Sequence, residues 1–299
     1  MKPAVSVIMP VRNSAQYVYF AVESILKQSF GDFEFIIIDD ASDDHTRQIL
    51  NEINDNRIIR INNEKHTGNY KCRNQGLSIA TGKYIAVMDA DDIACSNRFS
   101  KQYDFMESNL EFMATGSDIL FFNDTFTSLF QRIRDFDELK VNLLKDNVCS
   151  HPSLMFRNDI IKLHRIWYNE DYYYSSDYDL IQRISQVGKI TNLPEPLLHY
   201  RLHNKQISTL KKAEQVMYAD YIRLKQLSLL KLRPSTDEMM IHLSLMKDLP
   251  IPESKIILAE EWCNKLLSKN HKLNIYNELH LYRFLEERLN NELLIQRRH

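Results

Sequence analysis

Short apolar runs alternate with amphipathic stretches through the first 110 residues of the chain. The run VSVIMP at 5–10 is almost wholly apolar, as expected of a strand buried on both faces of a parallel sheet. Similar strand patterns follow at 33–39, 57–62 and 83–89, and apolar residues at helical spacing predict helices at 14–29, 43–53, 69–80 and 96–109. This order predicts a doubly wound, Rossmann-like α/β sheet with helices on both faces.

Polar and acidic residues follow several of the predicted strands. Residues 10–13 come after the first strand, Asp39 and Asp40 after the second, and 89–92 after the fourth. In open α/β sheets, ligands bind beyond the carboxyl ends of the strands. The sequence therefore predicts a polar site along one edge of the sheet.

The fourth strand ends in a cluster of acids, in the stretch YIAVMDADD at 84–92. Asp89, Asp91 and Asp92 would repel one another unless something offsets their charge. Two carboxylates at this spacing can bind Mg²⁺ or Mn²⁺, which also take phosphate and water as ligands. By itself the pattern is weak, because a solvated strand end or a charge cluster before a helix would look the same.

Composition excludes several classes of protein. The net charge of −2 gives no overall basic excess, so we expect no nucleic-acid partner. The four cysteines form no metal-binding or paired spacing, which favours free thiols in a reducing compartment. The chain has neither a signal-peptide pattern nor an apolar run of membrane-spanning length. We therefore expect a cytoplasmic protein, with peripheral association at the inner face of the membrane left open.

The pattern changes along the chain and suggests two regions. Residues 1–205 form the α/β domain, with a regular half at 1–110 and a less regular half at 111–205. In the second half, strands are predicted at 112–122, 153–156 and 197–203, and a helix at 175–188. From 206 to 299 strand signals vanish, and we expect four or five helices with no recognisable catalytic pattern.

Four ordered motifs over about residues 4–208 resemble glycosyltransferase family 2, a family of inverting enzymes with the GT-A (nucleotide-diphospho-sugar transferase) fold. The first is VSVIMPVRNSAQYVYFAVESILKQSFGDFEFIIIDDASDD, and the second is RNQGLSIATGKYIAVMDADD. YNEDYYYSSDYDLIQRIS and HYRLHNKQIS resemble the two later motifs of the family. The resemblance implies a transferase that uses a nucleotide-sugar donor and a divalent cation, Mn²⁺ or Mg²⁺. It also implies that 1–110 is the nucleotide-sugar-binding half of the domain and 111–205 the acceptor-side half.

The resemblance also implies roles in donor binding. Asp40 would accept a hydrogen bond from the base, which favours a uridine donor, while either Asp39 or Asp40 could instead cap the next helix. Arg73 would lie near the diphosphate or the base, and Gly76 would let its helix approach the sheet. The residues expected to bind the nucleotide-sugar are Pro10, Val11, Arg12, Asp40, Arg73, Asp89 and Ala90.

Metal binding falls to the acidic cluster by the same resemblance. Asp91 would carry most of the metal contact, Asp89 would meet the metal or the ribose, and His203 could touch the metal or the diphosphate. Asp92 would either cap the following helix or hold a metal-bound water. Arg98 is expected to brace the acidic loop through an ion pair.

Asp177 matches the family's catalytic base. An inverting transfer is a single displacement at the anomeric carbon, so the attacking hydroxyl must lose its proton to a nearby carboxylate. The chain departs from the family pattern at Ser176, where a glutamate is usual. His151 and Ser176 are expected on the acceptor side of the site.

The sequence and the resemblance together predict a metal-dependent inverting glycosyltransferase, with a UDP-linked donor expected and a glycan or lipid-linked glycan hydroxyl as acceptor. The departure at Ser176 leaves open a catalytically weak homologue that serves as a nucleotide-binding scaffold. A sugar nucleotidyltransferase is disfavoured, because no glycine-rich loop with Arg or Lys follows the first strand. The sugar, the acceptor and the oligomeric state, including a homo-oligomer, stay open.

Overall fold

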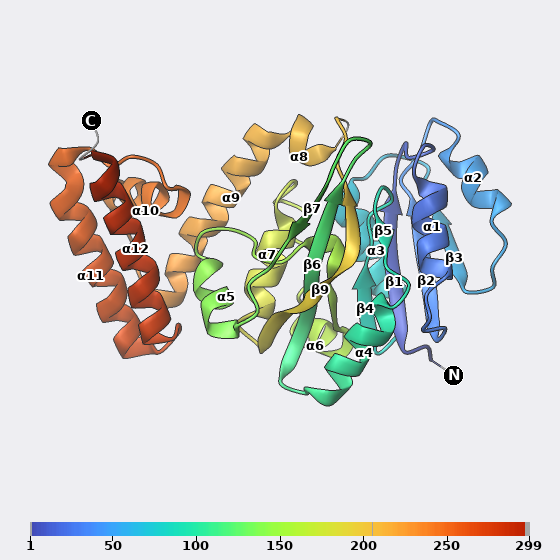
Figure 1. Cartoon of the computed structure of the whole chain (residues 1–299), viewed down its shortest axis with the longest axis horizontal. Coiled ribbons are helices and arrows are strands. Elements are labelled where there is room, and N and C mark those ends of the chain that lie inside the picture. Colours follow the sequence, from blue (N-terminus) through green and yellow to red (C-terminus); the bar gives the residue numbers. More distant parts are fainter. Residues whose placement is uncertain (1, 205, 297–299) are drawn as a thin grey trace. The chain divides into compact units, whose positions relative to one another are not determined.

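The computed structural model describes residues 2–204 and 206–296 (Figure 1). The chain forms two compact units. Unit 1 comprises Met1–Arg134 and Cys149–Lys211, and unit 2 comprises Asp135–Val148 and Lys212–His299. Within the described residues, no helix has the length and apolar character needed to cross a membrane.

Unit 1 is built on one mixed sheet whose strand order is β3-β2-β1-β4-β8-β6-β9-β5, with β7 paired to β6. The first four strands of this order run parallel, β8 is antiparallel to both of its neighbours, and β6 and β9 are parallel. The strands are β1 (Val5–Val11), β2 (Phe33–Asp39), β3 (Ile58–Asn62), β4 (Tyr84–Val87), β5 (Ile93–Ala94), β6 (Phe112–Phe122), β7 (Thr127–Phe130), β8 (Met155–Arg157) and β9 (Lys189–Arg201).

Helices cover both faces of the parallel part of the sheet, as the sequence predicts. Val5, Val7 and Met9 of β1 face one core, which they share with apolar residues of α1 (Val18–Leu26), α2 (Thr46–Glu52) and α4 (Arg98–Ser108). Alternate side chains such as Ile8 point to the other face, where α3 (Asn69–Ile79) packs. A Cβ at Gly76 would lie 2.6 Å from Cγ2 of Ile8, so only glycine lets α3 come this close.

The rest of unit 1 consists of short helices and the long strands β6 and β9. These helices are the 3₁₀ turn His151–Ser153, α6 (Asn158–Leu163), α7 (Ser176–Ile184) and α8 (Ile207–Leu210). β9 begins at Lys189, although a strand was expected only from 197. The first half of β9 was not predicted because it contains Pro194 and Pro196, and proline argues against a strand. In the structure, shifts in the register between β6 and β9 accommodate the two prolines.

Unit 2 is helical, with α5 (Phe136–Asn142), α9 (Lys212–Gln226), α10 (Thr236–Lys247), α11 (Ile256–Leu273) and α12 (Glu278–Gln296). Its core centres on Trp262, which is 1% exposed and donates a hydrogen bond to Nδ1 of His242. Val141 and Leu144, from α5 and the turn after it, belong to the same apolar core. Part of unit 2 therefore comes from the middle of the chain.

Candidate active site

The turns after β1 and β2 are tied to each other at the carboxyl edge of the sheet. Asn13 and Ala41 adopt left-handed backbone conformations, with φ of 50° and 56°. The Asn13 N–H donates to Oγ of Ser42 at 3.1 Å, and the Asp43 N–H donates to Oδ1 of Asn13 at 3.0 Å. These bonds fix the two loops that follow the strands. Pro10 and Val11 are buried in β1 just before the first turn, and Arg12 is exposed on it.

Asp39 and Asp40 are adjacent but have different partners. Asp39 accepts hydrogen bonds from the backbone and hydroxyl of Ser42 and pairs with Nε of Arg47 at 2.6 Å, so it stabilises the turn into α2. Asp40 is 3% exposed and accepts from donors on the loop 63–68. These donors are the Thr67 N–H, the Gly68 N–H, the Thr67 hydroxyl, Nδ1 of His66 and Nδ2 of Asn63, at 2.7–3.3 Å.

These contacts set the charge state of Asp40. Burial raises its pKa, but the backbone hydrogen bonds from Thr67 and Gly68, with the side-chain bonds from Thr67 and Asn63, outweigh burial and bring the pKa down to about 2. Asp40 is therefore a carboxylate at neutral pH. It holds the loop 63–68 against the end of β2.

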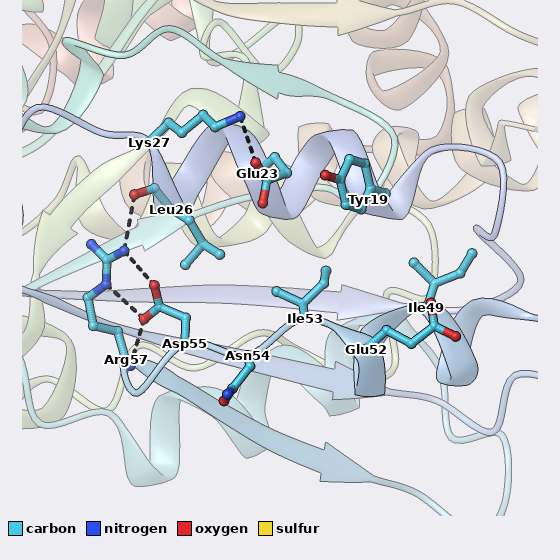
Figure 2. A pocket seen from close by; sticks show the side chains of 10 residues that line it. All are labelled: Tyr19, Glu23, Leu26, Lys27, Ile49, Glu52, Ile53, Asn54, Asp55 and Arg57. Carbon is cyan, nitrogen blue, oxygen red and sulfur yellow. Dashed lines mark hydrogen bonds and ion pairs between the residues drawn. The ribbon is translucent and has the colours of Figure 1, made fainter.

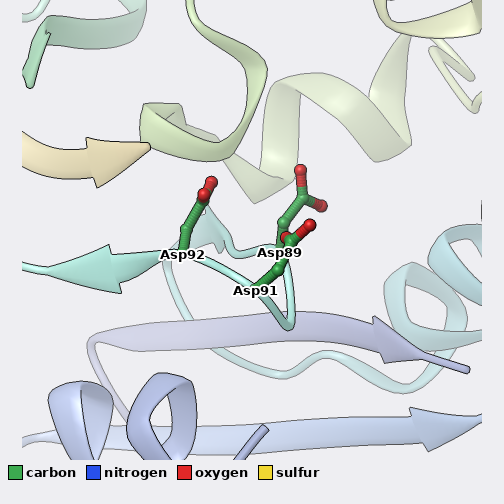
Figure 3. Close-up of side chains that lie close together, drawn as sticks. All are labelled: Asp89, Asp91 and Asp92. Atoms are coloured by element: carbon green, nitrogen blue, oxygen red, sulfur yellow. The ribbon is translucent and has the colours of Figure 1, made fainter. Parts of the chain in front are cut away.

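Asp89, Asp91 and Asp92 converge in the loop that leaves β4. Each offers a carboxylate oxygen, and these oxygens lie within 4.8 Å of one another. Figure 3 shows the three side chains projecting to the same side of the loop. Ala90, which separates Asp89 from Asp91 in the sequence, adds little bulk. Burial raises the pKa of Asp89, and the charge of Asp91 adds to this, while Arg73 opposes it. The cluster therefore holds more negative charge than its surroundings stabilise.

Asp92 is 1% exposed and does not cap a helix. Its Oδ1 accepts the Arg201 N–H at 2.9 Å, and α4 begins only at Arg98, so the expected capping role is wrong. Burial raises the pKa of Asp92 well above its usual value, and the charges of Asp91 and Asp89 raise it further. Within the described chain, its Oδ2 has no hydrogen-bond partner.

Arg98 supports the acidic loop in a different way from the expected ion pair. Its guanidinium donates to the carbonyls of Val87 and Leu154 and to Oε1 of Gln102. Burial lowers its pKa to about 10, although the charge of Asp92 opposes this. Arg98 thus holds the end of β4 beneath the acids by binding backbone carbonyls.

Arg73 of α3 is 1% exposed and forms an ion pair with Asp89 through Nη2. In the described part of the chain, its Nε and Nη1 have no hydrogen-bond partner. Buried guanidinium donors are normally satisfied, so two unsatisfied donors beside an acidic cluster suggest a site for an anionic group.

His203 reaches the acidic cluster from the segment after β9. Its Nε2 lies 2.9 Å from Oδ2 of Asp91, and its ring packs 4.9 Å from that of Tyr17. Nε of Arg201 donates to the backbone carbonyl of Asp91 at 2.9 Å. The structure therefore brings together Asp89, Asp91 and His203, the three residues expected at the metal.

Asp177 lies in the first turn of α7, close enough to Asp89 for its charge to raise that residue's pKa. The Tyr70 hydroxyl donates to Oδ1 of Asp177 at 3.1 Å. Ser176 is fully buried, and its Oγ has no partner among the described residues. Asp179, also in the first turn of α7, pairs with Nε of Arg183 at 2.7 Å.

His151, expected on the acceptor side, packs against Tyr168. It is 9% exposed, and its Nε2 is 2.8 Å from the Tyr168 hydroxyl. Burial lowers the pKa of His151 well below its usual value, and nearby Arg73 lowers it further, so the ring is neutral. Tyr168 and Tyr70 were not expected at the site. The spacing of Tyr70, three residues before Arg73 on a predicted helix, could have indicated it.

A separate pocket of about 420 Å³ lies between α1 and the segment 49–57 (Figure 2). It is lined by none of the residues predicted for the site. Lys27 pairs with Glu23, and Arg57 pairs with Asp55 and donates to the Leu26 carbonyl. Its charged groups thus largely satisfy one another, and the pocket lies at the amino end of β3, away from the acidic cluster.

The donor set around the acids fits a divalent cation. Mn²⁺ and Mg²⁺ prefer carboxylate oxygens, and Mn²⁺ also accepts imidazole nitrogen. The unpartnered Oδ2 of Asp92 and the raised pKa of both Asp89 and Asp92 are the features that a nearby cation would relieve. With the free donors of Arg73 beside them, the residues can accommodate a cation and an anionic group together.

Two solved structures that align with this chain hold nucleotide-sugars. Staphylococcus aureus TarS 1–349, in complex with UDP-GlcNAc, aligns with a TM-score of 0.62 at 17% identity, over 98% of this chain and 89% of that one. The mannosyltransferase PcManGT of Pyrobaculum calidifontis, in complex with GDP-Man and Mn²⁺, aligns with a TM-score of 0.59 at 12% identity, over 98% and 87%. The curled mixed sheet is thus the GT-A fold, as predicted.

Sequence relatives cover most of the chain. A glycosyltransferase of Methanocaldococcus jannaschii is 36% identical over 74% of this chain and 78% of its own length. The Escherichia coli protein WfaP, named a UDP-Glc:alpha-D-GlcNAc-diphosphoundecaprenol beta-1,3-glucosyltransferase, is 30% identical over 73% and 85%. The profile described as "Glycosyl transferase family 2" matches residues 6–164, which include both the acidic cluster and Arg73. The chain therefore belongs to glycosyltransferase family 2.

Proposed function

We propose that this glycosyltransferase moves a sugar from a UDP-linked donor to a hydroxyl of a surface glycan, with inversion at the anomeric carbon and dependence on a divalent cation. The observation that carries the proposal is the convergence of three carboxylates beside two donors of Arg73 that have no hydrogen-bond partner among the described residues. A nucleoside diphosphate with its cation supplies both missing partners. The name of WfaP supports a UDP-linked donor and a lipid-diphosphate-linked acceptor, and such an acceptor would put the reaction at the cytoplasmic face of a membrane.

Donor binding would use the carboxyl edge of the sheet. Pro10, Val11 and Arg12 would line the nucleotide, next to the turn that Asn13 ties to Ser42. Asp40 would contribute to binding of the nucleotide base through the loop 63–68, because its oxygens already accept hydrogen bonds from that loop. Arg73 would donate to the diphosphate, and Asp89 with Ala90 would meet the ribose side of the donor.

A cation held by Asp91, Asp89 and His203 would offset the charge that develops on the leaving diphosphate. Asp177 would accept the proton of the attacking acceptor hydroxyl. In the same step, the hydroxyl oxygen would bond to the anomeric carbon, and the bond between that carbon and the leaving diphosphate would break. The position of Asp177 beside Asp89 supports this division of labour. Ser176 and His151 stay predictions for the acceptor side, where both side chains are now buried.

The test is donor turnover with matched variants. Purified protein is incubated with UDP-, GDP- and TDP-sugars and Mn²⁺, and released nucleotide is measured with water as acceptor. We expect UDP release that disappears in Asp91→Ala and in Asp177→Ala but persists in Asp55→Asn, which alters a carboxylate at the remote pocket. Tight UDP binding without turnover of any donor, with or without added glycan acceptors, would support the scaffold alternative. Failure of UDP and Mn²⁺ to bind together would overturn the proposal.

A further inference from the structure

We propose that Tyr70 is the positioning residue for the proton acceptor of this enzyme, holding the Asp177 carboxylate in its reactive orientation. The inference rests on the proposed role of Asp177. The Tyr70 hydroxyl donates to Oδ1 of Asp177 at 3.1 Å, across 107 residues of sequence. Tyr70 therefore contacts Asp177, the proposed proton acceptor, directly. Tyr70 itself lies on α3, the helix that carries Arg73 of the proposed donor site.

The face of α3 that carries Tyr70 explains why this contact is fixed. Tyr70, Arg73 and Asn74 stand at i, i+3 and i+4 and therefore share one side of the helix. Arg73 binds Asp89 of the acidic cluster, and Asn74 binds both the N–H and the carbonyl of Tyr168 at 2.9 Å. The single helix α3 thus contacts Asp177, the acidic cluster and the segment leading to α7, and it fixes their relative positions.

The ring of Tyr70 has little freedom to move. It stacks on Tyr168, with centroids 5.5 Å apart and an angle of 18° between the ring planes. Tyr168 is 3% exposed and is held in turn through its hydroxyl by His151. The hydroxyl of Tyr70 is therefore aimed at Asp177 by packing that does not depend on substrate.

The chemistry of the contact suits a positioning role. Burial raises the pKa of Tyr70 well above its usual value, and the charge of Asp177 raises it further, so the phenol keeps its proton and acts as a donor at neutral pH. A hydrogen bond to a carboxylate is among the stronger ones in proteins and sets its rotamer. The base then presents itself to an acceptor without first losing rotational freedom.

The test compares Tyr70→Phe with Tyr103→Phe and Asp177→Asn, using UDP-glucose, Mn²⁺ and the release of UDP. Tyr103 of helix α4 is a matched control, because its ring is also half-buried and packs against other aromatic rings, those of Phe30 and Tyr84. We expect kcat to fall about ten- to a hundredfold in Tyr70→Phe, the range for losing a bond to a charged group. The KM for UDP-glucose and the thermal stabilisation by UDP with Mn²⁺ should stay within about twofold of wild type, because a positioning role affects the chemical step alone.

The outcomes separate this inference from the proposed function. If Asp177→Asn abolishes UDP release while Tyr70→Phe matches Tyr103→Phe in kcat, Tyr70 has no positioning role and the function stands. If Asp177→Asn keeps wild-type turnover, or wild-type protein turns over no donor, the proposed function fails. A crystal structure of the wild-type protein tests the contact without turnover: a Tyr70 hydroxyl turned away from Asp177 overturns the inference.

Discussion

Replacing Asp40 by asparagine tests how the carboxyl edge of the sheet is held together. In the folded protein Asp40 has a pKa of about 2, against an ordinary value of 3.8. At about 1.4 kcal/mol per pKa unit, this difference corresponds to about 2 kcal/mol of stability at neutral pH. Because Asp40 is 3% exposed, solvent screening takes away little of that amount. Asparagine also turns an amide donor toward donors of the loop 63–68, so about 2 kcal/mol is the lower end of the expected loss.

The pH dependence follows from the direction of the shift. A carboxyl whose pKa is lowered by folding stabilises the protein above its unfolded pKa, and the contribution is lost as pH falls through the folded pKa. The difference between wild type and Asp40→Asn in the free energy of unfolding should therefore be full at pH 7 and 5. It should shrink from about pH 4 toward pH 2. Urea unfolding followed by circular dichroism at pH 7, 5, 4 and 3.5 measures it.

Asp55→Asn is the matched control, because Asp55 also has a pKa of about 2, through its bonds to Arg57, but lies at the remote pocket. Both variants should lose stability. Only Asp40→Asn should also weaken UDP binding with Mn²⁺, by about tenfold if one bond of about 1.4 kcal/mol is lost. Equal stability of Asp40→Asn and wild type at pH 7, or a difference that stays constant down to pH 3.5, would refute the reasoning.

Three further substitutions have expected outcomes. Arg73→Met should lower the free energy of unfolding by about 1–3 kcal/mol at pH 7.5, because Asp89, whose side chain is 31% exposed, loses its ion-pair partner; urea unfolding should show a smaller loss at pH 5, where Asp89, with its raised pKa, takes up a proton more readily. Gly76→Ala should cost about 1–3 kcal/mol by overpacking against Ile8, and an unchanged melting temperature would contradict the close approach of α3. Asp91→Asn should abolish the thermal stabilisation that Mn²⁺ adds to UDP, as chelation by EDTA does in wild type; persistence of that effect would remove Asp91 from the metal site.

The acidic cluster could be predicted because the sheet itself brings it together. Parallel strands end at a common edge, so apolar runs followed by acids indicate where Asp89 and Asp91 lie without any knowledge of the loops. The partner of the cluster was harder to predict, since Asp177 and His203 come from later segments that only the family resemblance connects to the site. The structure brings both residues to the acids.

Features set by long-range contacts escaped the sequence. The oxygens of Asp40 accept from a loop more than 20 residues away, and no local pattern indicates such partners. Tyr168 lies in an aromatic-rich stretch where every tyrosine looks alike. Asp92 lies before a helix in the sequence, which made helix capping a reasonable expectation. Instead, its Oδ1 accepts a hydrogen bond from the backbone N–H of Arg201, in a strand far along the chain.

The inclusion of α5 in unit 2 has a consequence for how the protein is made. During synthesis, α5 leaves the ribosome soon after β6 and β7. The helices of unit 2 that bury Val141 and Leu144 are synthesised last. The nascent chain must therefore carry the apolar segment around Val141 and Leu144, unburied, while Cys149–Lys211 of unit 1 and the first of the later helices of unit 2 are synthesised. Truncation before α9 would leave that segment without its core for good. Residues 135–148 therefore complete their core only after the last helices of unit 2 have been synthesised.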